Sequence, residues 1–201
     1  MSAPVNREIL YPGMRVGLLG GSFNPAHAGH RHISLIALKR LQLDRVWWLV
    51  SSQNPLKPVR GMASLPDRVK SANAIAGHPR IVVSTIEKRL RTAYTRDTLA
   101  ALRQRWPGVH FVWLMGADNL AQLPRWRNWN QIMRLMPVAV LDRPGSGIRV
   151  LHGKAALRYA YARIPLAAAP RLVTQSAPAW IFIPCRLHPA SSTAIRAERS
   201  S

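Results

Sequence analysis

The sequence predicts an α/β fold in which helices cover both faces of a doubly wound, mostly parallel sheet. Short, nearly continuous apolar runs alternate along the chain with longer amphipathic runs, as strands alternate with helices in such folds. The short runs are rich in β-branched and aromatic residues, which is typical of parallel strands that are buried on both faces. A length of 201 residues suits a single domain with a sizeable core.

Six short apolar runs are predicted to be strands, and they comprise residues 15–20, 45–51, 80–85, 110–116, 137–143 and 180–184. Six amphipathic runs are predicted to be helices, and they comprise residues 30–43, 64–77, 94–106, 126–136, 154–164 and 191–200. Right-handed crossovers give a Rossmann-like arrangement, in which ligands bind beyond the carboxyl ends of the strands. We expect one domain over residues 1–201, with its core over about 14–200 and an N-terminal extension over 1–13.

The charge balance indicates anionic partners. The chain has 29 Lys and Arg residues against 8 Asp and Glu residues, which gives a net charge of +21. Most of the basic residues are arginines, which bind phosphate through forked contacts. The acidic residues stand singly, so we expect neither a carboxylate cage for a divalent metal nor a glycosidase pair.

Cysteine usage and hydropathy indicate the compartment. Cys185 is the single cysteine, which excludes an intrachain disulfide and a cysteine zinc site and favours a reducing compartment. The apolar runs fall short of the roughly 18 to 20 residues of a membrane span, and the first residues lack the pattern of a signal peptide. We therefore expect a cytoplasmic protein with no membrane partner.

The loop after the first predicted strand has the pattern G-G-S-F-N-P-A-H-A-G-H over residues 20–30. Gly20 and Gly21 permit close backbone approach, and Gly29 lets an anion come near the helix start, where N–H groups and the helix dipole favour negative charge. His27 and His30 can donate hydrogen bonds to phosphoryl oxygens there. A metal site and a pair of surface histidines are the alternatives, but the sequence offers no third ligand nearby. The pattern therefore favours phosphate binding.

Two further segments follow predicted strands. Asp118 comes directly after a buried run that ends at Gly116, at the sheet edge where ligand contacts are expected. Ser191, Ser192 and Thr193 lie at a predicted helix start with Arg196 one turn later, and their hydroxyls can cap the helix or bind an anion. Phosphate sites at two helix starts can together hold a triphosphate.

These motifs resemble those of the nicotinate-nucleotide adenylyltransferases, a family of the H-x-G-H nucleotidyltransferase superfamily, in five segments between Arg15 and Arg196. The resemblance implies that the 5′-phosphate of nicotinate mononucleotide attacks the α-phosphorus of ATP in line, giving deamido-NAD and pyrophosphate in NAD biosynthesis without a covalent enzyme intermediate. It also implies that Mg²⁺ arrives with ATP. Catalysis is then positioning and charge stabilisation.

The resemblance assigns roles to individual residues. The implied catalytic residues are His27, His30 and Arg196. The implied ATP contacts are Gly20, Gly21, Ser22, Phe23, His27, Gly29, His30, Gly116, Asp118, Ser191, Ser192, Thr193 and Arg196. The implied contacts with the nicotinate nucleotide are Gln53, Lys57, Tyr94, Thr95 and Trp126.

Several of the predicted acceptor residues also have an alternative, purely structural interpretation. Lys57 either reaches a phosphate or lies in a rigid, solvated loop. Thr95 or Thr92 can instead be the N-cap of the helix that follows. Trp126 offers a flat face for the nicotinate ring, but Trp126 and Trp129 can also form a core-facing stripe of one helix; we assign Trp129 to the core and Trp126 to the ligand.

Two other functions compete with this prediction. Another member of the superfamily, such as a pantetheine-phosphate adenylyltransferase, shares the phosphate loop but not the acceptor segments T-A-Y-T-R-D-T-L and L-P-R-W. The charge of +21 suggests a nucleic-acid binder. The basic residues, however, occur singly through every segment rather than in one strip with aromatics, so we expect no specific nucleic-acid partner.

Overall fold

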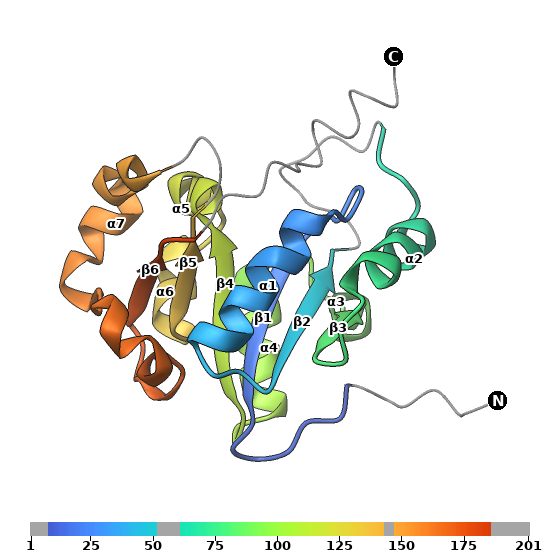
Figure 1. Ribbon diagram of the computed structural model, residues 1–201, viewed down its shortest axis with the longest axis horizontal. Helices are drawn as coiled ribbons and strands as arrows, with labels where there is room; N and C mark the ends of the chain where they lie inside the picture. Colours follow the sequence, from blue (N-terminus) through green and yellow to red (C-terminus); the bar gives the residue numbers. More distant parts are fainter. Residues whose placement is uncertain (1–7, 52–60, 143–146, 186–201) are drawn as a thin grey trace.

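The computed structural model describes residues 8–51, 61–142 and 147–185, and within these ranges the strands form one sheet (Figure 1). The strands are β1 (Arg15–Gly21), β2 (Arg45–Val50), β3 (Ile81–Ser84), β4 (His110–Gly116), β5 (Val138–Leu141) and β6 (Trp180–Ile183). Their order is β3-β2-β1-β4-β5-β6, and every pairing is parallel. The predicted doubly wound α/β fold is confirmed, and the described sheet is parallel throughout.

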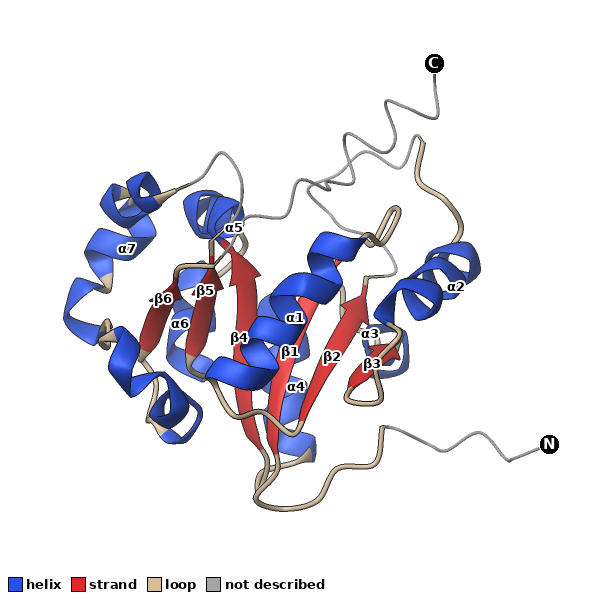
Figure 2. Ribbon diagram, viewed as in Figure 1, coloured by secondary structure: helices blue, strands red, loops and turns tan. Residues whose placement is uncertain are grey.

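Helices and 3-10 turns connect the strands (Figure 2). The helices are α1 (Ala28–Arg40), α2 (Leu65–Ala76), α3 (Ile86–Leu90), α4 (Thr95–Arg105), α5 (Ala117–Gln122), α6 (Trp129–Leu135) and α7 (Lys154–Arg158). The 3-10 turns are η1 (Leu123–Arg125), η2 (Ile148–His152), η3 (Ala160–Ala162) and η4 (Leu166–Thr174). Each of these helices is too short or too polar to cross a membrane.

The sheet has an apolar core on both faces because successive side chains of a strand point to opposite sides. On β2, Trp47 and Leu49 join the cluster beneath α4, α6 and α7, whereas Trp48 joins the cluster beneath α1 and α2. Both indoles are fully buried. The nearly continuous apolar runs of the sequence are thus explained by burial on both faces, as predicted.

The strand order places a switch point between β1 and β4. From β1 the chain adds β2 and β3 on one side, and from β4 it adds β5 and β6 on the other. The connections that leave the carboxyl ends of β1 and β4 therefore diverge, and α/β folds generally bind ligands at such a switch point. The phosphate loop (residues 20–30) follows β1 and the β4–α5 connection follows β4, so both start at this switch point.

Several predicted helix bounds are wrong. The helix predicted from Trp126 begins at Trp129, because η1 precedes it and Asn128 takes a left-handed conformation with φ 55°. The helix predicted over residues 154–164 ends at Arg158 and continues as the separate turn η3. The short helices α3 and α5 and the turn η4 were not predicted, because they are too short or too irregular for an apolar period to show. The helix predicted over residues 191–200 lies outside the described residues.

The described part of the predicted N-terminal extension packs against the domain. Leu10 joins the core cluster beneath α4. Glu8 accepts a hydrogen bond from the Ser84 hydroxyl at the end of β3 and pairs with Arg89 of α3, with Nη2 and Oε2 2.5 Å apart. Residues from Glu8 onward are therefore held to the β3 edge of the sheet.

Candidate active site

The phosphate loop leaves β1 beneath a tightly packed indole. A Cβ atom added to Gly20 would lie 2.3 Å from Cη2 of Trp113, whose side chain on β4 is buried. The loop then turns at Phe23, which has φ 47° and stacks its buried ring on Trp48 at 5.1 Å. Gly20 is therefore required by core packing, which the sequence did not reveal, and a contact of Phe23 with a nucleotide has to come from its main chain.

His27 and His30 cap the first turn of α1 reciprocally. His27 is the N-cap, and its Nδ1 accepts a hydrogen bond from the N–H of Gly29 at 3.1 Å. Nδ1 of His30 accepts from the N–H of His27 at 3.3 Å, and the ring centroids lie 3.9 Å apart. Because Nδ1 accepts in both rings, each neutral imidazole holds its proton on Nε2. The structure thus brings the two predicted histidines together, with Nε2–H as the donor of each.

A second set of contacts, from Phe23, Trp48 and Ser34, holds His30 in place. Its ring lies 4.8 Å from that of Phe23 and 5.9 Å from that of Trp48. The indole N–H of Trp48 donates to the Ser34 hydroxyl at 2.8 Å, and this hydroxyl donates to the carbonyl of His30 at 2.8 Å. Residues on β2 and α1 therefore set the position of the imidazole, as pre-organisation of a site requires.

Arg68 of α2 lies behind the phosphate loop, and sequence reasoning gave it no role. Its side chain is 2% exposed, and its Nη1 donates to the carbonyls of Ser22 at 2.8 Å and Ser51 at 2.7 Å. Burial lowers the pKa of its guanidinium from the ordinary value. One signal was present in the sequence: Arg68 stands four residues before Ala72 and eight before Ala76, on the buried side of the helix.

Two further contacts join the phosphate loop to its neighbours. The N–H of Ser51, at the end of β2, donates to the carbonyl of Gly21 at 3.0 Å. The Asn24 side chain donates to the carbonyl of Gly61 and accepts from the N–H of Ala63, both at 3.2 Å. The loop is therefore attached both to β2 and to the segment that leads into α2.

Gly116 and Asp118 lie where the sequence predicted them. Gly116 ends β4 and is the N-cap of α5, and Asp118 follows in the first turn of that helix. β1 and β4 pair in parallel, with Leu19 opposite Leu114. Their carboxyl ends consequently meet at one edge, with the phosphate loop and Asp118 on either side of the switch point.

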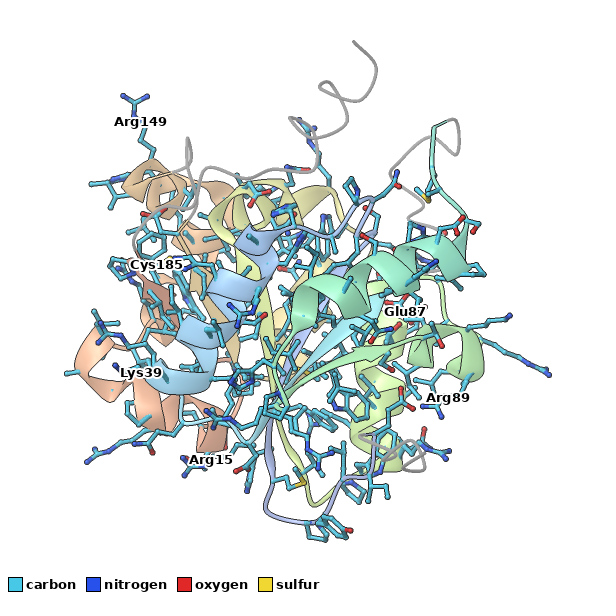
Figure 3. All side chains as sticks on the ribbon, turned by 45° about the vertical axis from the view of Figure 1, so that its right-hand side comes forward. Arg15, Lys39, Glu87, Arg89, Arg149 and Cys185 are labelled. Carbon is cyan, nitrogen blue, oxygen red and sulfur yellow. The ribbon has the colours of Figure 1, made fainter. Side chains whose placement is uncertain are left out.

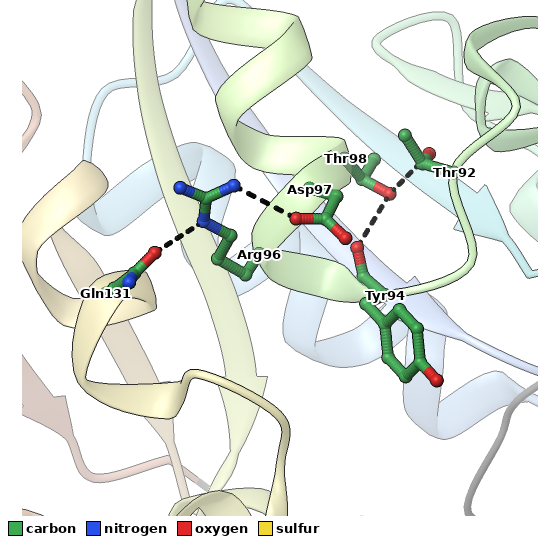
Figure 4. A network of polar contacts seen from close by, with 6 residues as sticks. All are labelled: Thr92, Tyr94, Arg96, Asp97, Thr98 and Gln131. Atoms are coloured by element: carbon green, nitrogen blue, oxygen red, sulfur yellow. Dashed lines mark hydrogen bonds and ion pairs between the residues drawn. The ribbon is translucent and has the colours of Figure 1, made fainter.

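The start of α4 holds two of the predicted acceptor residues. Tyr94 is the N-cap of α4 and makes no side-chain capping bond, and Thr95 is the first residue of the helix (Figure 4 shows Tyr94). The hydroxyl of Thr92 instead lies 2.8 Å from that of Thr98, which donates to the carbonyl of Tyr94 at 3.3 Å. The alternative that Thr95 or Thr92 is the N-cap is therefore wrong.

Trp126 and Trp129 belong to different elements. Trp126 follows η1 in an extended conformation, half-buried against the core cluster beneath α4. Trp129 starts α6 and makes an edge-to-face contact with the Tyr159 ring at 6.0 Å, which confirms its assignment to the core. Trp126 is therefore no part of a helical stripe. Next to it, the Arg127 guanidinium lies over the Tyr94 ring, 4.6 Å from its centroid.

The remaining predicted site residues lie outside the described residues. They are Gln53, Lys57, Ser191, Ser192, Thr193 and Arg196. Among the residues that are described, His, Cys, Asp and Glu side chains form no group of three that could hold a metal ion.

Charge is spread over the periphery of the described structure. The labelled basic side chains Arg15, Lys39, Arg89 and Arg149 project from different sides of the molecule (Figure 3). In contrast to these peripheral basic side chains, the carboxyl of Glu87 in α3 is buried. Desolvation raises its pKa to about 7. The positive charge is therefore not gathered in one strip by these residues.

Comparisons with known proteins identify the family of this chain. Residues 18–198 match the cytidylyltransferase-like family. A probable nicotinate-nucleotide adenylyltransferase of Cereibacter sphaeroides is 59% identical over 184 residues, covering 92% of this chain and 97% of the relative. A protein of the same description from Methylorubrum extorquens is 53% identical over 183 residues, covering 91% of this chain and 99% of the relative.

Solved structures share the fold at low identity. The Plasmodium falciparum nicotinic acid mononucleotide adenylyltransferase complexed with NaAD superposes with a TM-score of 0.69 at 14% identity, over 92% of this chain and 83% of that one. The same enzyme complexed with APC gives a TM-score of 0.66, over 90% and 82% of the two chains. These structures show the shared fold, whereas the identity to the bacterial relatives favours the nicotinate family over the pantetheine-phosphate alternative. The chain belongs to the cytidylyltransferase-like family and, within it, to the nicotinate-nucleotide adenylyltransferases, which are nucleotidyltransferases.

Proposed function

We propose that this chain transfers the adenylyl group of ATP to nicotinate mononucleotide, giving deamido-NAD and pyrophosphate in NAD biosynthesis. The observation that supports this most directly is the reciprocal pair of His27 and His30 at the start of α1. Helix N–H groups and two imidazoles with their protons on Nε2 suit a transition state that gathers negative charge on phosphoryl oxygens. The names of the bacterial relatives support the choice of acceptor.

The proposed reaction is a single in-line displacement. A 5′-phosphate oxygen of nicotinate mononucleotide bonds to the α-phosphorus of ATP, while the bond from that phosphorus to the oxygen bridging to the β-phosphorus breaks. Pyrophosphate leaves with that electron pair, so no covalent enzyme intermediate forms. The chain supplies positioning and charge stabilisation, with His27 and His30 donating to oxygens of the α- and β-phosphates.

Other predicted residues have supporting roles in this proposal. Asp118, beside the switch point, contacts the adenosine of ATP. Arg196, with the hydroxyls of residues 191–193, binds the pyrophosphate end of ATP. Tyr94, Thr95 and Trp126 surround the nicotinate ring. Mg²⁺ enters as part of the MgATP substrate, which requires no carboxylate cage in the protein. We also place the reaction in the cytoplasm, where a protein with a single cysteine finds a reducing environment.

The decisive experiment compares acceptors. Purified full-length protein is incubated with MgATP and either nicotinate mononucleotide, nicotinamide mononucleotide or phosphopantetheine, and pyrophosphate release is measured. We expect the highest kcat/KM with nicotinate mononucleotide, and deamido-NAD as the product identified by mass. A preference for phosphopantetheine, or no pyrophosphate with any acceptor, contradicts the proposal.

A further inference from the structure

Arg68 binds the main chain of three segments, two of which are distant from it in the sequence. Its Nη1 donates to the carbonyl of Ser22 in the phosphate loop, at 2.8 Å, and to the carbonyl of Ser51 at the end of β2, at 2.7 Å. Its Nε donates to the carbonyl of Ala63, just before α2, at 3.0 Å. One side chain thus binds the main chain just after β1, just after β2 and just before α2.

Arginine is suited to this task because its planar fork fixes the directions of several donors at once. Lysine has a positive charge as well, but its single nitrogen cannot reproduce the planar fork. A buried guanidinium is costly unless its N–H groups are satisfied, and the side chain is 2% exposed. The helix therefore retains a charged group on its buried side, where Ala72 and Ala76 are the neighbouring buried positions.

The contact with Ser22 connects Arg68 to the residues that we propose bind the phosphates. Ser22 lies in the loop between Gly20 and the histidines, and its carbonyl is held on the side of Arg68. Fixing this carbonyl fixes the orientation of the peptide unit that joins Ser22 to Phe23, because a peptide bond is planar. Phe23 in turn supports the His30 ring at 4.8 Å.

We propose that Arg68 is a positioning residue for adenylyl transfer, which holds the phosphate loop in the shape that aligns its N–H groups and His30 with the phosphates. The proposal rests on the proposed function for its kinetic part only. Misplacement of a catalytic group by about 1 Å costs ~100-fold in rate, so a loop that loses this contact turns over slowly even when the protein is folded.

Three variants test the proposal. Arg68→Met removes charge and donors, and Arg68→Lys retains the charge without the fork. Leu172→Ala is the control, because it removes a buried side chain of η4 from the hydrophobic cluster that also contains Ala72 and Ala76 of α2, and η4 packs against β4 and β6. Steady-state kinetics with MgATP and nicotinate mononucleotide are measured at a temperature where circular dichroism shows each variant folded.

We expect kcat to fall ~10-fold or more for Arg68→Lys and further for Arg68→Met, on the scale of a misaligned catalytic group. Leu172→Ala retains the kcat of the parent although it unfolds at a lower temperature. An unchanged kcat in folded Arg68→Lys, or an equal loss in Leu172→Ala, overturns the proposal.

Amide hydrogen exchange gives a readout that needs no activity. We expect faster exchange at Ser22 and Phe23 in Arg68→Lys than in the parent, with unchanged exchange in β4 and β5. If Ser22 and Phe23 exchange in Arg68→Lys as slowly as in the parent, the proposal is contradicted. This test remains available even if Arg68→Met does not fold. If the parent releases no pyrophosphate, the proposed function fails, while the exchange experiment still tests the role of Arg68.

Discussion

The guanidinium carbon of Arg127 lies 4.6 Å from the centre of the Tyr94 ring, in a cation–π contact that joins the loop before α6 to the start of α4. Arg127 is exposed, whereas Tyr94 and the adjacent Trp126 are half-buried. A positive charge therefore stands beside two of the aromatic residues that we propose surround the nicotinate ring. The carboxylate of nicotinate is negative and the amide of nicotinamide is neutral, so this charge favours the acid.

Arg127→Met tests this preference. We expect kcat/KM for nicotinate mononucleotide to fall ~10-fold, as after loss of one hydrogen bond to a charged group, with little change for the amide. Arg125→Met, two residues earlier, is the control for removal of an exposed arginine. An equal loss with both acceptors would show that Arg127 acts on something other than the carboxylate.

His30→Ala is expected to lower kcat by ~100-fold or more, which is the effect of losing one pre-organised donor. The protein should remain folded, because the other contacts of α1 are retained. His32→Ala is the matched control, since residues two apart on a helix do not face each other. Turnover is measured as pyrophosphate release, and folding by thermal denaturation. A fully active His30→Ala protein would remove His30 from the catalytic residues.

Gly20→Ala is expected to destabilise the protein by about 1–3 kcal/mol, as overpacking of a core does. The added Cβ would lie 2.3 Å from Cη2 of Trp113. Gly21→Ala should cost less, because there the nearest atom is Cε2 of Phe23 at 3.3 Å. Urea denaturation measures both. Trp113→Phe in the Gly20→Ala background should restore part of the loss; a double variant no better than additive would show that the two side chains do not clash.

Glu87 predicts a pH dependence of stability. Burial raises the pKa of this carboxyl to about 7 in the folded protein, above the ordinary value of 4.5. Folding therefore favours the protonated form, and stability from this group is lost as the pH rises from 4.5 through 7. The loss is about 3 kcal/mol at most.

Glu87→Gln removes the titration, so it isolates this effect. We expect the variant and the parent to have similar free energies of unfolding at pH 4.5, and the variant to be the more stable at pH 8. Urea denaturation at both pH values measures the difference. A difference between the two proteins that is the same at both pH values would contradict the assignment.

The sequence predicted those features that repeat or that stand beside a strand end. Apolar runs located the six strands of the described residues, because burial on both faces leaves little room for polar residues. The positions of His27, His30 and Asp118 after strand ends were predicted because each follows a strand in a recognisable pattern. The spacing of Arg68 from Ala72 and Ala76 indicates the buried side of a helix, but its contacts with Ser22 and Ser51, 46 and 17 residues away, show only in the structure.

The local pattern also misplaced one helix start. The i, i+3 spacing of Trp126 and Trp129 is that of one helix face, yet Asn128 between them takes a left-handed conformation and the helix starts at Trp129. At Gly20, where the sequence predicts close backbone approach, the structure adds a packing requirement, because the indole of Trp113 lies beside it. The spacing of apolar residues shows neither the conformation of Asn128 nor the contact between Gly20 and Trp113.

The pairing of β1 with β4 divides the sheet into two three-stranded halves that are each continuous in the sequence. The phosphate loop belongs to the first half and Asp118 to the second. A folding intermediate or a proteolytic fragment that contains only one half therefore lacks part of the nucleotide site that we propose, however well its own strands are formed. Recovery of enzymatic activity thus indicates that the two halves have docked. Two separately expressed halves would regain activity only after β1 pairs with β4.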